Sequence, residues 1–357
     1  MRAQPPAIWQ ASYPATLAPI FNRHQLRIYT MLAKKFCFIA WLTFMSFLTY
    51  SQAVDNMASF RMMQTDKYMR LHYENDYFSK SDRYYTQGVH HEFVNPLFGR
   101  YLWNRLLLGT RTGTRLYGIG LEHNAYTPAS IESHDILIGD RPFAADFFVK
   151  FFSMKNDGFK QKRITSALAL GVLGPAASGE EIQHGIHKLI GDTEPQGWEH
   201  QIRNTLLLTY DAGIEKNIVH IKHNFLLNGF GNARIGTVND KLSVGIVLMA
   251  GKIHSTTASV FSRIAIAGKN KFNFQVYAQP IVNAVLFDAT MQGGLFRENP
   301  YALTSGQIQR FTIQGNYGLV IQFRSLYLEY FQSVITKEFE AGSMHKWGGV
   351  RIGVNVK

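Results

Sequence analysis

The chain has 357 residues, of which 46% are hydrophobic and 13% aromatic, and its formal net charge is +12. It contains one cysteine, Cys37, which excludes an intramolecular disulfide framework. No basic run or nucleic-acid-binding motif accompanies the positive charge, so a nucleic acid partner is not expected.

Residues 1–53 have the pattern of a leader that is removed on export. Residues 31–35 form a short basic region, residues 36–50 an apolar region, and residues 51–53 (Ser-Gln-Ala) a small-x-small cleavage site, so translation is expected to start at Met31. The apolar region is too short to favour a retained membrane anchor. The leader holds five basic residues and no acidic one, so the net charge of +12 becomes +7 after cleavage. A modestly basic exported protein indicates an anionic partner such as a lipopolysaccharide surface.

Residues 54–357 are expected to form a single domain of short alternating segments. They contain no apolar run of the roughly 18 residues that a membrane helix needs. Period-two alternation predicts strands at residues 68–74, 84–94, 114–126, 143–153, 163–173, 204–213, 232–238, 242–251, 272–278, 311–319, 320–330 and 347–356. Together with the leader and the aromatic content, this pattern predicts a transmembrane antiparallel β-barrel of about twelve strands in the outer membrane of a Gram-negative bacterium. A soluble periplasmic sandwich is the alternative fold.

A short helix is predicted over residues 180–190, ended by Gly191. On a 3.6-residue period, Gln183, His187 and Ile190 share one face of this helix. Outer-membrane barrels begin in the periplasm, so odd-numbered strands run towards the cell surface. This parity places the helix in the third extracellular loop.

The same parity places Asn75, Asp76 and Thr86 at the outer end of the first two strands. Three separated polar elements, including His187, therefore converge at the outer rim, which predicts a functional site there. Asn75 and Asp76 could instead be a turn pair that satisfies its own backbone.

Several short motifs follow one another along the chain in the order found in a known family. They are Glu74-Asn75-Asp76, residues 82–88 (DRYYTQG), residues 139–144 (GDRPFA), Gly174-Pro175, Gly197-Trp198 and residues 336–339 (TKEF). Together they resemble the outer-membrane lipid A 3′-O-deacylases, the LpxR family, over nearly the whole mature chain. The resemblance implies a twelve-stranded barrel that hydrolyses the 3′-linked acyloxyacyl ester of lipid A. It also implies a divalent cation, thought to be Ca²⁺, in a site between the barrel wall and a loop helix. We expect a monomer whose partners are lipid A, lipopolysaccharide and other outer-membrane lipids.

The resemblance also implies roles for individual residues. His187 matches the family's proposed base, Asn75 and Asp76 match its amide and acidic pair, and Thr86 matches its hydroxyl residue. An imidazole can take a proton from water as that water attacks the ester carbonyl. Oxygen donors such as those of Asp76, Asn75 and Thr86 suit Ca²⁺, which can polarise the carbonyl.

The chain departs from the family pattern in two places. Where a characterised form of the family carries a glutamate shortly after the histidine, the ungapped match falls on Thr193, and a one-residue shift makes Glu194 a candidate metal ligand. A lysine–arginine patch of the family's second extracellular loop aligns with Ser133-His134-Asp135, so substrate selectivity is expected to differ.

Two other classes of protein fit parts of the pattern. One is a non-enzymatic pore or structural barrel whose rim residues bind only the cations that bridge lipopolysaccharide. The other is an outer-membrane phospholipase, a class that relies on a serine–histidine pair. No G-x-S-x-G motif is present in the chain.

Overall fold

The computed structural model describes residues 57–63, 65–79, 83–109, 112–191, 193–221, 224–252 and 272–356. The predicted leader, residues 1–53, lies outside the described residues. None of the helices in the described part of the chain is both long enough and apolar enough to cross a bilayer.

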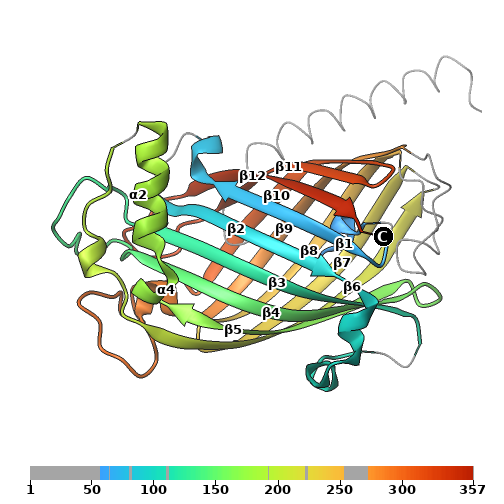
Figure 1. The fold of residues 1–357 in the computed structure, drawn as a ribbon, viewed down its shortest axis with the longest axis horizontal. Coiled ribbons are helices and arrows are strands. Elements are labelled where there is room, and N and C mark those ends of the chain that lie inside the picture. Colours follow the sequence, from blue (N-terminus) through green and yellow to red (C-terminus); the bar gives the residue numbers. More distant parts are fainter. Residues whose placement is uncertain are drawn as a thin grey trace, which may run out of the picture. The chain divides into compact units, whose positions relative to one another are not determined.

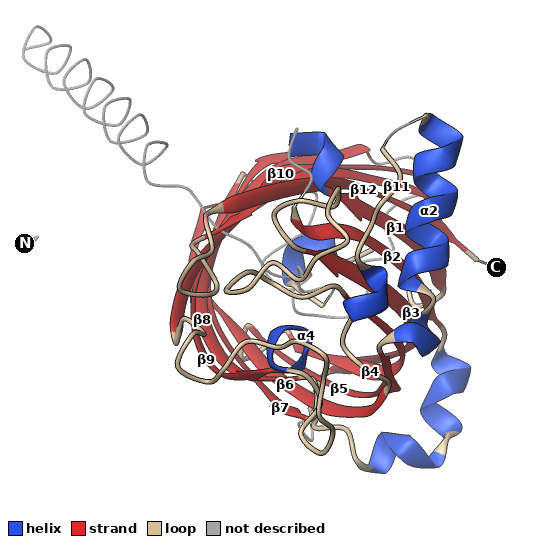
Figure 2. Cartoon of the chain, turned by 90° about the vertical axis from the view of Figure 1, so that its left-hand side faces the viewer, coloured by secondary structure: helices blue, strands red, loops and turns tan. Residues whose placement is uncertain are grey.

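Twelve antiparallel strands in the described part of the chain close into a barrel (Figures 1 and 2). They are β1 (Tyr68–Asn75), β2 (Tyr84–Val94), β3 (Thr114–Thr127), β4 (Ala144–Asp157), β5 (Lys162–Leu173), β6 (Thr205–Ile221), β7 (Phe225–Gly236), β8 (Asn239–Lys252), β9 (Phe272–Asp288), β10 (Phe311–Phe323), β11 (Leu326–Ile335) and β12 (His345–Asn355). Each strand pairs with the next, and β1 closes the ring by pairing with β12 along its whole length. The predicted antiparallel β-barrel of about twelve strands is therefore confirmed.

Short helices occupy several of the connections. They are the α-helices α2 (Gly179–Ile190) and α4 (Ala289–Gln292), and the 3-10 helices η1 (Ser59–Arg61), η2 (Asp76–Ser79), η3 (Pro96–Arg100), η4 (Leu102–Arg105), η5 (Pro175–Ala177) and η6 (Trp198–His200). The predicted helix at residues 180–190 corresponds to α2. It lies between β5 and β6, as expected.

Several predicted strand boundaries were wrong, although the order of the strands was right. β9, for example, continues to Asp288 rather than ending at residue 278, and β11 ends at Ile335 rather than at residue 330. β6 continues to Ile221 rather than ending at residue 213, and β7 begins at Phe225 rather than at residue 232. The turn between β10 and β11 falls at Arg324-Ser325, not between residues 319 and 320. Arg324 adopts a left-handed conformation with φ 54°, without the glycine or asparagine that usually marks such a turn. The sequence therefore gives no local signal for its position.

The two faces of the barrel wall differ in polarity. On β11 the inward-facing, buried side chains are those of Tyr327, Glu329, Phe331 and Ser333, and the exposed outward ones are those of Leu326, Leu328 and Tyr330. An apolar outer face and a polar inner face are the arrangement that a lipid environment requires of a barrel.

Residues 57–63, here called the inner segment, lie inside the barrel. Their backbone carbonyls accept hydrogen bonds from three strands that are not all neighbours: Arg163 of β5 donates to Met57 (2.9 Å), Gln275 of β9 to Phe60 (2.8 Å) and Gln322 of β10 to Met62 (3.1 Å). These side chains of β5, β9 and β10 point into the barrel from separate parts of its wall. They can all reach one short segment only if that segment lies in the lumen. The inner segment therefore fills one end of the barrel.

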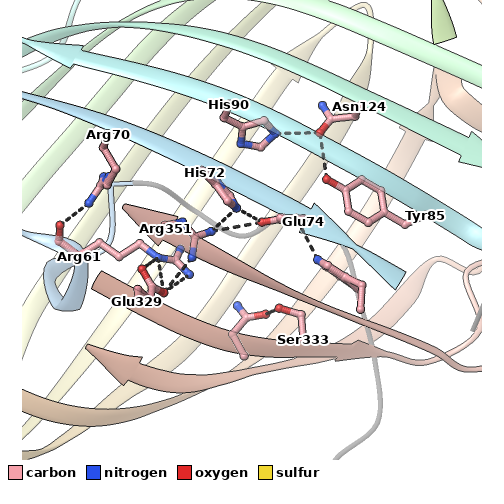
Figure 3. Close-up of polar contacts among 12 residues, drawn as sticks. Arg61, Arg70, His72, Glu74, Tyr85, His90, Asn124, Glu329, Ser333 and Arg351 are labelled. Atoms are coloured by element: carbon pink, nitrogen blue, oxygen red, sulfur yellow. Dashed lines mark hydrogen bonds and ion pairs between the residues drawn. The ribbon is translucent and has the colours of Figure 1, made fainter. Parts of the chain in front are cut away.

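Arg61 of the inner segment enters a buried charge cluster centred on Glu329 (Figure 3). The Glu329 carboxylate pairs with Arg61 at 3.1 Å and with Arg351 of β12 at 2.8 Å. Tyr277 and Tyr327 donate their hydroxyls to the same carboxylate at 2.5 and 2.7 Å. All three charged side chains are inaccessible to solvent. A buried ion pair is costly to break from one side, because the remaining charge keeps its desolvation penalty.

We predict that Arg61→Ala lowers the free energy of unfolding by about 3 kcal/mol, since it withdraws one of the two cations that face Glu329. The measurement is urea unfolding of the barrel in lipid vesicles. Arg324→Ala is the matched control, because Arg324 is exposed in the β10–β11 turn, and it should change stability by no more than about 0.5 kcal/mol. Equal stability of the two variants would contradict a structural role for the inner segment.

Candidate active site

Helix α2 lies outside the ring of strands, against the wall of the barrel (Figure 2). Its first residue, Gly179, sits so close to the outer face of β4 that a Cβ atom there would stand 2.4 Å from the Cβ atom of Ala145 and 2.8 Å from the Trp198 ring. Trp198 is 1% exposed and packs against Phe143. The helix is thus held on the lipid-facing side of the wall by close packing at its N-terminus.

A bulge in β2 turns Thr86 towards this helix. The pairing of β2 with β3 shifts between Tyr85 and Gln87, so Thr86 is the extra residue. Tyr85 bonds to Asn124 in the lumen, and alternation resumes inward at His90, which also bonds to Asn124. A bulge re-aims a side chain without breaking the strand. Thr86 therefore belongs to the outer face, where it is buried (3% exposed) under the loop helix.

Gln183 connects the helix to Thr86. Its amide nitrogen donates to the Thr86 hydroxyl at 3.5 Å, and its amide oxygen accepts from the Trp198 indole nitrogen at 2.8 Å. These contacts form a chain from the strand bulge through α2 to the segment that follows the helix. The prediction that Gln183 and His187 share a face is consistent with their burial, because both are among the buried residues of α2.

His187 is oriented by a backbone atom. Its Nδ1 lies 2.6 Å from the carbonyl oxygen of Thr193. A carbonyl can only accept a hydrogen bond, so Nδ1 carries the proton, and the neutral ring then presents Nε2 as a bare acceptor. The side chain is buried (7% exposed), and Nε2 makes no hydrogen bond to another residue in the described ranges. This is the tautomer that a general base needs.

Asn75 and Asp76 lie at the adjoining end of β1. Asn75 pairs in register with Gln87, the residue after Thr86, and falls on the outward side of β1 because its neighbour Glu74 faces the lumen. Asp76 is 2% exposed and accepts a hydrogen bond from the backbone N–H of Arg83 at 2.7 Å. Asp76 therefore helps to close its own loop, as in the turn interpretation, while standing next to Asn75 and the bulge.

The donor set at this end of the barrel is oxygen-rich but carries few charges. Within the described residues, no group of three or more histidine, cysteine, aspartate or glutamate side chains is placed to hold a metal ion. The Glu194 side chain is exposed, and its backbone carbonyl accepts from Gln196. The carboxylate of Asp76, the amide oxygen of Asn75 and the hydroxyl of Thr86 are the oxygen types that a hard cation takes. In their chemistry, these three residues fit Ca²⁺.

Asp140 and Arg141 brace the loops over this end of the barrel. Asp140 accepts from the backbone N–H of Ala129, and Arg141 pairs with Glu338 at 3.1 Å and donates to Thr290. Tyr301 accepts from the Gly139 N–H and donates to the Asp140 carbonyl, and burial raises the pKa of its hydroxyl, which stays protonated for that second bond. The second loop is therefore tied to the β9–β10 and β11–β12 connections.

A cavity of about 120 Å³ lies inside the lumen, apart from this exterior arrangement. It is lined by ion pairs of inward strand residues, including Lys150 with Glu122 and Arg234 with Asp211. The predicted site residues are absent from its lining. The candidate site thus belongs to the outer face of the wall.

Two features of the site carry no sequence signal that reveals them. The partner of His187 is the backbone carbonyl of Thr193, whose side-chain type is irrelevant to the contact. The bulge at Thr86 occurs without a glycine at that position. The sequence indicates both partners of the Gln183–Trp198 bond, because Gln183 is on the predicted helix face of His187 and Trp198 is in the Gly197-Trp198 motif.

These features define an outer-membrane β-barrel with a polar site between its wall and an external loop helix. The family model described as "Outer membrane protein LpxR" matches residues 37–356, and the chain belongs to this family. It is therefore a protein of the outer membrane.

Among solved structures, LpxR from Salmonella typhimurium is similar with a TM-score of 0.66 and 18% sequence identity, covering 81% of this chain and 100% of that one. The β domain of the Bordetella autotransporter BrkA is similar with a TM-score of 0.39 and 10% identity, covering 81% of this chain and 98% of that one. At these identities the likeness concerns the fold alone. No curated protein sequence matches the chain.

Two glycines of α2 allow a direct test of how the helix docks. Gly179→Ala places a methyl group against Ala145 and Trp198, whereas a Cβ at Gly185 meets no atom within 4 Å. We predict that Gly179→Ala loosens α2 from the wall and speeds hydrogen exchange of its amides. Gly185→Ala should slow that exchange, because alanine favours a helix over glycine by roughly 1 kcal/mol. Identical exchange in the two variants would mean that close packing at Gly179 does not hold the helix.

Proposed function

We propose that the protein hydrolyses the 3′-linked acyloxyacyl ester of lipid A in the outer leaflet of the outer membrane. The observation that carries this proposal is the orientation of His187, whose Nδ1–H is fixed on the Thr193 carbonyl so that Nε2 is left to accept a proton. Membership of the LpxR family supports the same substrate.

The position of the site suits a lipid substrate. Thr86, Asn75 and α2 are all on the exterior of the wall, at the end where the long loops gather. The outer face of the strands is apolar, as at Leu206 and Leu208, which are 81% and 50% exposed. Acyl chains that lie along this face would bring an ester to the rim without leaving the membrane.

In the proposed reaction, water attacks the ester carbonyl carbon while His187 Nε2 takes its proton. The bond between the carbonyl carbon and the ester oxygen then breaks. The same imidazole returns the proton to that oxygen, which stays on the sugar. The products are the free acyloxyacyl acid and a sugar hydroxyl. The Thr193 carbonyl stabilises the imidazolium formed between the two proton transfers, because it accepts from Nδ1 in both states.

Asp76, Asn75 and Thr86 would hold a divalent cation, which we propose to be Ca²⁺. When bound, such a cation polarises the ester carbonyl and stabilises negative charge on its oxygen. Gln183 keeps the Thr86 hydroxyl directed to α2, and the Arg83 backbone N–H fixes the Asp76 carboxylate. One protein carboxylate implies weak binding, which is sufficient where divalent cations already bridge lipid A phosphates.

The inner segment argues against a porin. Residues 57–63 occupy the lumen and bind the wall through the Glu329 cluster. A general pore needs a continuous polar channel, and this lumen contains a packed peptide in its place.

We predict that His187→Gln lowers deacylation by about a hundredfold or more, because glutamine cannot act as a general base. The measurement is mass spectrometry of lipid A from cells with and without the expressed variant. Barrel assembly should be unchanged, since α2 is outside the strand ladder, and heat-modifiable migration on gels checks this. His184→Gln is the matched control on the same helix: its ring contacts the Pro195 carbonyl and it is expected to retain activity. Near-wild-type activity of a folded His187→Gln barrel would contradict the proposed base.

We predict that excess chelator abolishes activity and that added Ca²⁺ restores it. Asp76→Asn removes the one carboxylate of the proposed donor set, so it should raise the Ca²⁺ concentration needed for half-maximal rate. Glu194→Gln tests the remaining candidate ligand: an unchanged Ca²⁺ concentration would leave this exposed carboxylate out of the donor set. Full activity in excess chelator would show that the reaction needs no cation. The proposed role of His187 would be unaffected, because the His187→Gln variant tests it separately.

A further inference from the structure

The connection between β2 and β3 is unusually rich in leucine and arginine. Residues 95–115 contain four arginines and no acidic residue. Within them, η3 and η4 form the compact teal segment that hangs outside the barrel in Figure 1. Residues 96–108 are here called the β2–β3 segment.

This segment folds back against the lipid-facing wall. The Trp103 ring lies 4.5 Å from that of Phe151 on β4, and a Cβ at Gly99 would stand 2.6 Å from the Tyr117 ring on β3. The Tyr210 hydroxyl on β6 donates to the Leu106 carbonyl at 2.7 Å. These contacts with β3, β4 and β6 hold the segment against the outer surface of the barrel wall, not beyond the end of the strands.

The docked segment exposes apolar side chains on its free side. Leu97, Leu102, Leu106 and Leu108 are 55%, 73%, 61% and 49% exposed. Tyr101, stacked on Trp103 at 4.4 Å, adds an aromatic ring to them. This surface is continuous with the apolar belt of the wall, through Trp103 and Phe151, so lipid is the environment that meets it.

Arg100 and Arg105 stand among these leucines, and both are exposed. A short helical segment that combines exposed leucines with arginines has the composition of an element that lies in the plane of a membrane interface. Cationic side chains at that depth attract anionic headgroups.

The topology selects the leaflet. The β2–β3 connection is at the end of the barrel opposite the β5–β6 loop that carries α2, because β2 and β5 run in opposite directions. With the N-terminal end of β1 in the periplasm, this end meets the inner leaflet of the outer membrane, which is built of phospholipid.

We propose that the β2–β3 segment is an interfacial anchor that binds anionic phospholipid of the inner leaflet. Its leucines enter the acyl region, and Arg100 and Arg105 bind headgroup phosphate. The surface is separate from the candidate active site and does not depend on the proposed reaction.

Tryptophan fluorescence provides the test, because Trp198 and Trp347 are 1% and 0% exposed whereas Trp103 is partly exposed. The whole barrel is reconstituted in phosphatidylcholine vesicles that contain either brominated phosphatidylglycerol or brominated phosphatidylcholine. Subtracting the signal of Trp103→Phe isolates the quenching of Trp103. We expect strong quenching, greater for the brominated anionic lipid.

The preference for anionic lipid is the ratio of Trp103 quenching by brominated phosphatidylglycerol to quenching by brominated phosphatidylcholine. Replacing both arginines, by Arg100→Gln and Arg105→Gln, should reduce this preference by about tenfold. Arg324→Gln, at an exposed turn of the same end of the barrel, should leave it unchanged. Heat-modifiable migration confirms that each variant is folded.

Two outcomes would overturn the proposal. In the first outcome, aqueous iodide quenches Trp103 and brominated lipid does not. The segment would then lie in water, as a surface for a periplasmic protein or a second copy of the chain. Equal quenching by the two brominated lipids, unaffected by the arginine substitutions, would show an apolar contact without a headgroup site.

Discussion

The pairing of β1 with β12 is the constraint on which the rest of this structure depends. Eight register pairs, from Tyr68 with Asn355 to Asn75 with Gly348, close the sheet on itself. In hydrocarbon an unpaired strand edge has no water to satisfy its N–H and C=O groups, so closure is the condition for a sheet to exist there. Once closed, the wall separates a polar lumen from a mainly apolar outer face. The chain uses the lumen for structural charge clusters and the rim for the candidate chemistry.

This division explains why the site needs a helix. The outer face of a lipid-facing wall cannot by itself bury a polar group such as Thr86. Helix α2 supplies the missing cover, and its approach is set by Gly179 and by the buried indole of Trp198. The hydrogen bonds of Gln183 then satisfy Thr86 and the indole together. The residues that pack α2 against the wall are thus close to those that supply hydrogen bonds to its buried polar groups.

The fold could be predicted from the sequence because its signal is repeated. Each strand alternates for about ten residues, and an error in one boundary, as at Arg324, leaves the order of the others intact. Strand parity also placed α2 at the same end as Asn75, Asp76 and Thr86. The details of the site depend instead on single backbone events. Tertiary packing determines the position of the Thr193 carbonyl and the bulge at Thr86. No pattern of side chains in the sequence predicts either of them. The inner segment was missed for a similar reason: seven residues ahead of the first strand have no periodicity to detect.

The inner segment also bears on the order in which the barrel forms. Arg61 and Glu329 are separated by 268 residues in the chain, and Ser59 and Glu215 by 156. Contacts of such range impose a large loss of chain entropy before they stabilise anything, so they form late. The segment precedes β1 in the chain, and β1 pairs with β12, the twelfth strand of the described barrel. Because Arg61 stands shortly before β1, closing the β1–β12 seam also brings Arg61 to Glu329 and Arg351 on the neighbouring strands β11 and β12.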